Sequence, residues 1–298
     1  MKNKLFLPHV SALIAMFIWG GSYVWSSQVF KVLQPGTTVL LRLIISSIFL
    51  LLINAMLRRP IKIERKDIGL FFIAAALEPF LYFISESYGL VRVSPTICSA
   101  IIATIPLFAP FAAFFILREH ISGWNILGLV VSFVGILFML VNKNMQLTAS
   151  LSGILFLFGA VIVAVCYSIA LKKLTYRYQA LTIVTMQNSI GIIYFLFFVL
   201  LFERNQWNAL AQFDQYIVQI LLLGILASSV SYVLYTHAVA KLGVTRSNVY
   251  TNLIPIFTAF FSYILIHEQI TGMKATGIFI VIFGLILSQL KFKTSTTA

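Results

Sequence analysis

Ten long apolar segments divide the chain and leave little sequence for a soluble domain. A helix needs about 20 mainly apolar residues to cross a hydrocarbon layer of ~30 Å. The 298 residues are 60% hydrophobic and only 10% charged, against about 25% charged in a soluble domain. We therefore predict an all-α polytopic membrane protein whose spans cover approximately 9–30, 36–57, 68–90, 94–117, 123–142, 150–171, 180–202, 214–240, 244–266 and 271–290.

Other interpretations of these segments fit less well. A membrane β-barrel would alternate apolar and polar residues over about ten positions, whereas these runs are continuously apolar. The first run follows Lys2 and Lys4 like a signal peptide, but it is long and lacks a clear cleavage site, so we expect an uncleaved helix. Cys98 and Cys166 lie inside apolar runs without metal-ligand spacing and are expected to act as small hydrophobic residues.

Positive charge is distributed unevenly between the two sides of the predicted membrane. The net charge of +13 would suggest a nucleic-acid partner in a soluble chain, but here the basic residues lie between spans. With the N-terminus in the cytoplasm, 15 of the 21 Lys and Arg residues fall on the inner side. This bias predicts a multi-pass inner-membrane protein with both termini cytoplasmic and the lipid bilayer, not nucleic acid, as its partner.

The two halves of the chain resemble each other without a gap at a shift of 149 residues. A register that aligns Pro, Glu and several Gly residues is hard to obtain by chance in apolar sequence. The aligned pairs are Thr96 with Thr245, Ile105 with Ile254, Pro106 with Pro255, Phe108 with Phe257, Phe111 with Phe260, Glu119 with Glu268, Ile121 with Ile270, Gly123 with Gly272, Gly128 with Gly277 and Gly135 with Gly284.

The earlier spans of each half match more weakly, at a shift near 145 that sets Arg42 against Gln187. We predict two repeats, residues 1–145 and 146–298, that form one membrane domain. Because each repeat has five spans, the second enters the membrane from the opposite side. Inverted repeats of this kind support alternating access around a site near the bilayer midplane.

The chain resembles the EamA type of the drug/metabolite transporter superfamily over essentially its whole length. The resemblance rests on the ten-span layout and on a few short sequences: Trp19-Gly20-Gly21-Ser22, Ile105-Pro106-Leu107-Phe108 with Arg118-Glu119, and Ile254-Pro255-Ile256-Phe257 with His267-Glu268. It implies a central cavity lined mainly by spans 1, 3, 4, 6, 8 and 9, and commonly the export of amino acids or related metabolites. One departure is that Trp19 meets Ala164 in the second half.

Three ionisable residues lie within predicted spans, where a charge is tolerated only when it faces protein, water or a partner. Glu78 and Glu86 are eight residues apart and share one helix face. The rise per residue places Glu78 near mid-membrane and Arg42 and Glu86 in the outer third. An Arg42–Glu86 ion pair is plausible and would leave Glu78, beside Pro79, to bind a proton or a substrate amine. The alternative is that Glu78 only hydrogen-bonds a neighbouring helix.

Several aromatic residues are candidates for lining the substrate cavity, because such sites mix apolar walls with a few hydroxyls. Each could instead be ordinary core. These candidates are Trp19, Tyr23, Tyr82, Tyr88, Tyr167, Tyr232 and Tyr235.

Repeated prolines, acids and glycines suggest structural roles. Pro106 and Pro255 interrupt the helical hydrogen-bond ladder and could be static kinks or hinges. Glu119 and Glu268 follow spans 4 and 9, where a carboxylate is expected to cap the next helix. The paired glycines of spans 5 and 10 predict close helix packing, either within the chain or between subunits.

A carrier for a small molecule accounts for these features best. The four histidines are scattered and form no catalytic or metal motif, so an enzyme is not expected, and neither is a cofactor. A channel or scaffold would give no reason for a buried Glu78. A sugar or nucleotide-sugar carrier is the alternative within the superfamily, but it would need more buried polar groups. The absence of a nucleotide-binding loop favours a gradient over ATP as the energy source.

Overall fold

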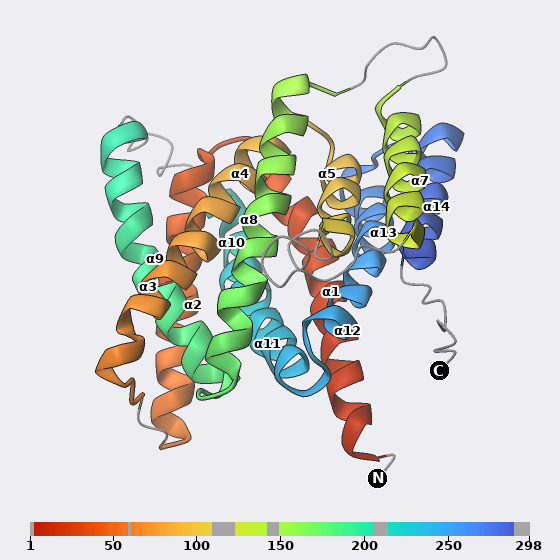
Figure 1. The fold of residues 1–298 in the computed structure, drawn as a ribbon. Helices are drawn as coiled ribbons and strands as arrows, with labels where there is room; N and C mark the ends of the chain where they lie inside the picture. Colours follow the sequence, from red (N-terminus) through yellow and green to blue (C-terminus); the bar gives the residue numbers. More distant parts are fainter. Residues whose placement is uncertain (1–2, 59–60, 109–122, 142–148, 205–213, 289–298) are drawn as a thin grey trace, which may run out of the picture.

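The computed structural model describes residues 3–58, 61–108, 123–141, 149–204 and 214–288, and helices account for most of them (Figure 1). In the first half these elements are α1 (Asn3–Val29), α2 (Pro35–Met56), the 3₁₀ turn η1 (Arg65–Asp67), α3 (Ile68–Ala75), the π-helical η2 (Ala76–Leu81), α4 (Tyr82–Leu90), α5 (Pro95–Ile102) and α7 (Gly123–Leu140).

The second half repeats this order. Its elements are α8 (Leu151–Thr175), α9 (Ala180–Phe202), α10 (Ile217–Leu221), the π-helical η5 (Leu222–Val230), α11 (Ser231–Leu242), α12 (Val244–Asn248), the 3₁₀ segment η6 (Val249–Leu253), α13 (Ile254–Ile266) and α14 (Gly272–Ser288). In Figure 1, α1 starts at the bottom and runs upward, whereas α8 starts at the top and runs downward.

The helices have the length and the surface of membrane spans. Seven of the described helical segments are long and apolar enough to cross a bilayer, and three shorter ones are also apolar. Large apolar side chains such as Leu52, Phe197 and Phe279 are exposed on the outside of the bundle. An all-helical chain satisfies its backbone hydrogen bonds internally, which is the requirement for residence in hydrocarbon. The protein is therefore an all-α polytopic membrane protein, as predicted.

Glycines join α7 to α14 along one side of the molecule (Figure 1). A Cβ atom added to Gly128 would lie 2.5 Å from the carbonyl oxygen of Gly284, and one added to Gly135 would lie 2.8 Å from that of Gly277. Only glycine permits such an approach of two backbones. The close packing expected of these glycines thus occurs within the chain.

Two spans are interrupted at corresponding places in the two halves. The first passes from α3 through η2 to α4, and the second from α10 through η5 to α11. Within η2 the backbone of Glu78 is extended, with φ −143° and ψ 119°. Irregular backbone at membrane depth is tolerated where it is buried in protein or faces a cavity. Both interruptions are therefore expected to lie against a cavity or against other helices of the bundle.

The two repeated prolines each follow a break in their helix. α5 ends at Ile102 and helix resumes at position 105, just before Pro106. Pro255 lies in the first turn of α13, directly after η6. A first turn accepts proline because its N–H has no helical partner there. The breaks thus precede the prolines, and the hinge role of Pro106 and Pro255 stays a prediction.

Of the two acids expected to cap the next helix, Glu119 lies outside the described residues. Glu268 accepts hydrogen bonds from Lys274 Nζ at 2.8 Å and from Thr96 Oγ1 at 2.9 Å. It therefore ties α14 to the start of α5, instead of binding backbone N–H groups. Partial burial acts to raise the pKa of Glu268, but its hydrogen bonds, led by the Lys274 ammonium, hold that pKa below its usual value.

Candidate functional site

A small cavity of about 70 Å³ lies between the two halves. Its wall combines aromatic rings, two carboxylates, one guanidinium and a few small polar groups. The residues that line it are Trp19, Ser22, Tyr23, Arg42, Glu78, Tyr82, Phe83, Glu86, Ile102, Ile105, Ala164, Tyr167, Ser168, Tyr232, Tyr235, Asn248, Thr251 and Ile254.

Repeat-related positions line this cavity from opposite halves. Trp19 and Ala164 are 145 positions apart in the chain, and both are in the wall, as are two further pairs at the same shift, Ser22 with Tyr167 and Tyr23 with Ser168. At the shift of 149, Ile102 pairs with Thr251 and Ile105 with Ile254. The cavity therefore sits where the two repeats face each other.

Glu78 reaches this cavity from the interrupted span of the first half. Its side chain is buried and accepts a hydrogen bond from the Tyr232 hydroxyl of α11. Its backbone carbonyl accepts one from Gln187 Nε2 of α9 at 3.2 Å. The extended backbone at Glu78 thus frees a carbonyl that the second half satisfies. Both partners come from the other repeat, so this carboxylate lies at the junction of the halves.

Glu86 lines the same cavity from α4, eight residues after Glu78. Its carboxylate accepts a hydrogen bond from Tyr82 Oη at 2.7 Å, and the side chain of Tyr23 also interacts with it. Two phenol groups therefore hold Glu86. With the guanidinium of Arg42, the two carboxylates leave one formal negative charge in excess in the cavity wall, which favours a positively charged guest.

Arg42 does not form the predicted ion pair with Glu86, although both residues are described and line the cavity. Its Nε donates to Ser228 Oγ of η5 at 2.7 Å, and its guanidinium lies 4.3 Å from the centre of the Phe83 ring. The rise per residue had placed the two charges at one depth, but Arg42 hydrogen-bonds the interrupted span of the second half instead.

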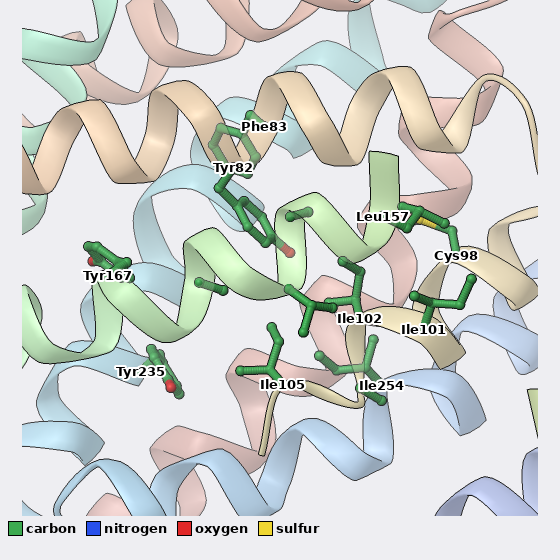
Figure 2. Close-up of a cluster of buried hydrophobic side chains, with 14 of the residues drawn as sticks. Tyr82, Phe83, Cys98, Ile101, Ile102, Ile105, Leu157, Tyr167, Tyr235 and Ile254 are labelled. Atoms are coloured by element: carbon green, nitrogen blue, oxygen red, sulfur yellow. The ribbon is translucent and has the colours of Figure 1, made fainter. Parts of the chain in front are cut away.

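An aromatic cluster forms part of the cavity wall. The Trp19 ring lies 5.0 Å from that of Tyr232 and 5.2 Å from that of Tyr235. Its indole Nε1 donates to the carbonyl of Ala227 in η5 at 3.1 Å. Figure 2 shows Tyr167 and Tyr235 on one side of Ile105 and Ile254 on the other, with Ile102 nearer the hydroxyl of Tyr82.

Tyr88 is the one aromatic candidate outside the cavity wall. Its hydroxyl donates to Glu203 Oε1 at 2.9 Å. The same carboxylate accepts hydrogen bonds from the backbone N–H groups of Gly36 and Thr37 at 2.9 and 2.7 Å. Glu203 therefore caps α2, as expected for a carboxylate at a helix N-terminus. Tyr88 supports this structural contact between the halves.

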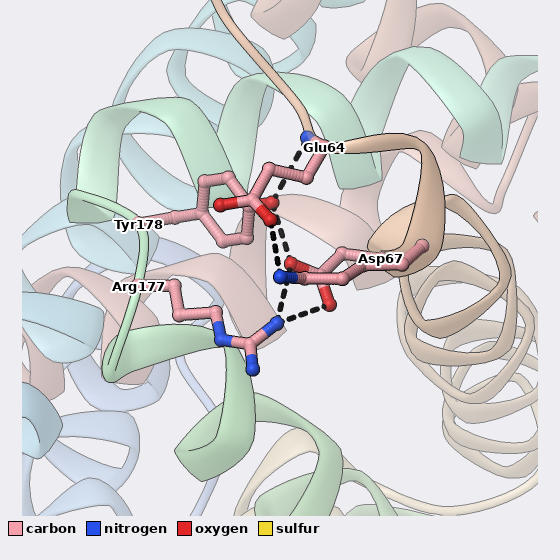
Figure 3. A network of polar contacts seen from close by, with 5 residues as sticks. Glu64, Asp67, Arg177 and Tyr178 are labelled. Carbon is pink, nitrogen blue, oxygen red and sulfur yellow. Dashed lines mark hydrogen bonds and ion pairs between the residues drawn. The ribbon is translucent and has the colours of Figure 1, made fainter.

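A second polar contact joins the halves near the start of α3 (Figure 3). Arg177 Nη1 donates to both carboxylate oxygens of Asp67, at 2.8 and 3.0 Å. The Tyr178 hydroxyl donates to Asp67 Oδ2 at 2.7 Å and accepts the backbone N–H of Glu64 at 3.1 Å. This contact ties the turn between α8 and α9 to the start of α3, where the interrupted span of the first half begins.

Sequence reasoning missed the neutral polar residues of the site. Asn248 and Thr251 line the cavity from the end of α12 and from η6, and Ser168 lines it from α8. Asn188 Nδ2 donates to Ser46 Oγ and to the carbonyl of Ser228, which ties α9 to α2 and to η5. Such residues are common in membrane helices, so each gave only a weak signal in the sequence.

Two inverted bundles around a central cavity are the architecture expected of a membrane carrier, and the comparisons show the class. The model of the EamA-like transporter family matches residues 7–141 and again 151–290. The protein belongs to the EamA-like transporter family, with one copy of its repeat in each half. The resemblance drawn from the sequence is thereby confirmed.

Relatives and a solved structure agree with this assignment. The chain is 22% identical to the uncharacterized transporter YcxC of Bacillus subtilis, over 99% of this chain and 97% of that one. It is 29% identical to the uncharacterized inner membrane transporter YhbE of Escherichia coli, over 89% and 83% of the two chains. A solved crystal structure with 12% identity matches the fold at a TM-score of 0.71, covering 95% of this chain and 96% of that one.

Proposed function

We propose that this protein is a secondary active transporter that exports amino acids or related small amine-bearing metabolites by alternating access. The observation that carries the proposal is Glu78, a buried carboxylate that faces the central cavity and is held from the opposite repeat by Tyr232 and Gln187. A carboxylate in such a place can bind a substrate ammonium or a coupling proton. Both termini are proposed to lie in the cytoplasm, on the basis of the charge bias.

The size of the cavity supports a cycle with closed and open conformations. Sites for small organic molecules usually enclose about 300–1,000 Å³, well above the 70 Å³ found here. A substrate therefore enters only if the halves move apart. The contacts at Glu203 and at Asp67 both join the halves, so opening toward either side would weaken at least one of them.

The test is transport by purified protein in liposomes loaded with a mixture of the twenty amino acids, with and without a pH gradient. Efflux by the wild-type protein is expected, and Glu78→Gln should slow it about tenfold or more, since one charge-assisted hydrogen bond contributes about 1.5–3 kcal/mol. Glu64→Gln is the matched control, because Glu64 is exposed and outside the cavity.

Wild-type efflux and an unchanged pH profile in Glu78→Gln would remove the role of this carboxylate. Absence of any efflux from the wild-type protein, together with an unchanged amino-acid content of the medium on overexpression, would overturn the substrate class.

A further inference from the structure

The cavity wall carries one buried hydrogen-bond donor that the protein itself does not use. Asn248 is 2% exposed, yet its Nδ2 has no hydrogen-bond partner among the described residues. Its Oδ1 accepts a hydrogen bond from the Tyr235 hydroxyl, which fixes the amide in place. A buried amide donor left unsatisfied costs about 1–3 kcal/mol, and such groups commonly have a partner that arrives from outside the chain.

Thr251 extends this polar patch. It lies in η6 beside Asn248, lines the same cavity, and its hydroxyl donates to the Asn248 carbonyl at 2.6 Å. Because that hydrogen is engaged, the Thr251 oxygen can only accept, while the Asn248 amide can donate. Asn248 is the last residue of α12 and Thr251 lies in the 3₁₀ segment η6, so the patch sits where the short helices between α11 and α13 change type beside the cavity.

The corresponding wall of the first repeat is apolar. At the shift of 149, Thr251 corresponds to Ile102, and Asn248 corresponds to Ser99, which is not part of the cavity wall. The Ser99 hydroxyl donates within its own helix to the carbonyl of Thr96. The repeated architecture therefore offers the same place twice, and only the second half fills it with a hydrogen-bond donor.

The donor lies about one helical turn from the acidic site. Tyr232, which binds Glu78, and Tyr235, which binds Asn248, are three residues apart on α11, a rise of about 4.5 Å along its axis. Trp19 contacts both rings. A molecule with a cationic group and an acceptor oxygen a few bonds apart would reach both places at once.

We propose that Asn248 forms a second subsite, which binds a carboxylate or carbonyl oxygen of the substrate while the acidic site binds its amine. The proposal rests on the proposed function and narrows its substrate to compounds that carry both groups. Ile102, Ile105 and Ile254 form the apolar wall that meets the rest of the molecule. Asn248 is then the residue that distinguishes an amino acid from the corresponding amine.

Matched pairs of compounds test this directly. Binding of phenylalanine and phenethylamine, leucine and isoamylamine, and lysine and cadaverine is measured by thermal stabilisation of purified full-length protein, and transport by counterflow in liposomes. The wild-type protein should prefer the acid in at least one pair. Asn248→Leu should weaken binding of that acid about tenfold, as loss of a hydrogen bond to a charged group predicts, while changing binding of the amine less than about twofold.

Two further variants keep the result interpretable. Asn248→Asp keeps the size of the side chain but replaces the donor with a carboxylate, so the preference should shift toward the amine even if Asn248→Leu folds poorly. Asn252→Leu is the matched control, because Asn252 is a buried asparagine of the same segment that does not line the cavity. Its preference for the acid should equal that of the wild-type protein.

Equal binding of acid and amine in every pair would overturn the subsite, as would an unchanged preference in Asn248→Leu or an equal loss in Asn252→Leu. If Glu78→Gln abolishes transport while Asn248→Leu changes no preference, the inference fails and the proposed function stands. If the wild-type protein binds no member of any pair, the inference fails, and efflux of the twenty-amino-acid mixture decides the proposed function separately.

Discussion

The two interrupted spans occupy the same place in their repeats but differ in what the interruption carries. In η2 the extended residue is Glu78, whose carboxylate faces the cavity. The corresponding η5 carries serines, and two hydroxyls donate to its carbonyls: Ser229 of η5 at 2.9 Å and Ser231, the first residue of α11, at 3.0 Å. The interruption is thus common to both repeats, whereas the acidic group belongs to one of them.

The second spans of the repeats support these interruptions crosswise. Arg42 of α2 donates to Ser228 in η5, and Gln187 of α9 donates to the carbonyl of Glu78 in η2. Arg42 and Gln187 correspond at the shift of 145. One position in the repeat therefore has one task, which a charged group performs in one half and a neutral amide in the other.

The largest effect on stability is expected for Arg42, the charged member of this pair of corresponding residues. Arg42→Leu removes a buried charge-assisted hydrogen bond to Ser228 and should lower the free energy of unfolding by about 3 kcal/mol. Reversible unfolding in mixed micelles measures it. A cycle with Ser228→Ala should show coupling of at least about 0.5 kcal/mol, and strict additivity would show that Arg42 acts elsewhere.

The neutral side should respond less. Gln187→Leu removes an uncharged hydrogen bond to the Glu78 carbonyl, so the same measurement should show a loss of about 1 kcal/mol. Ser189→Ala is the control, because that hydroxyl donates only within α9, to the carbonyl of Thr185. A loss in Gln187→Leu as large as in Arg42→Leu would contradict the distinction between the two supports.

The smallest effect should come from the ends of the repeats, outside the interruptions. The pKa of Glu268 is held below its usual value, so its ionised form stabilises the fold at neutral pH. That contribution is complete above the carboxyl pKa of the unfolded chain and is lost as the pH falls through the lower pKa of the folded state.

Glu268→Gln should therefore lower the free energy of unfolding at pH 7 by less than about 1 kcal/mol, which is measured as a small drop in melting temperature. In strong acid it should have no effect. Glu64→Gln removes an ion pair with Lys66 whose side chains are both exposed, and should change nothing at either pH. Greater destabilisation of Glu268→Gln in acid than at pH 7 would reverse the sign and contradict the assignment.

The architecture could be predicted from the sequence because it follows from strong, local signals. Apolar length gave the spans, and the register that aligns Pro106 with Pro255 and Gly128 with Gly277 gave the repeats. Glu78 stood out because an ionisable group inside a span is costly. The helix breaker Pro79 marks the interruption of the span formed by α3, η2 and α4. Nothing comparable marks η5, which contains no proline.

The detailed site could not be predicted because it depends on rotation about helix axes and on neutral groups. Arg42 and Glu86 line the same cavity, but they bind Ser228 and Tyr82 and do not form the ion pair predicted from rise alone. Tyr88 lies only six residues beyond Tyr82, yet its hydroxyl binds Glu203 and it does not line the cavity. Asn248 could not be singled out from the sequence, because only the structure shows which groups surround its amide and that its Nδ2 has no hydrogen-bond partner among the described residues.

The glycine contact between α7 and α14 has a consequence for how the chain is made. α7 is complete when about half of the protein has been synthesised, but the helix that covers its glycine face is the last of the described spans to emerge. Until then Gly128 and Gly135 face lipid or a temporary neighbour. Assembly of the first repeat thus finishes only with the final helix, and a chain that stops before Gly272 leaves that face uncovered.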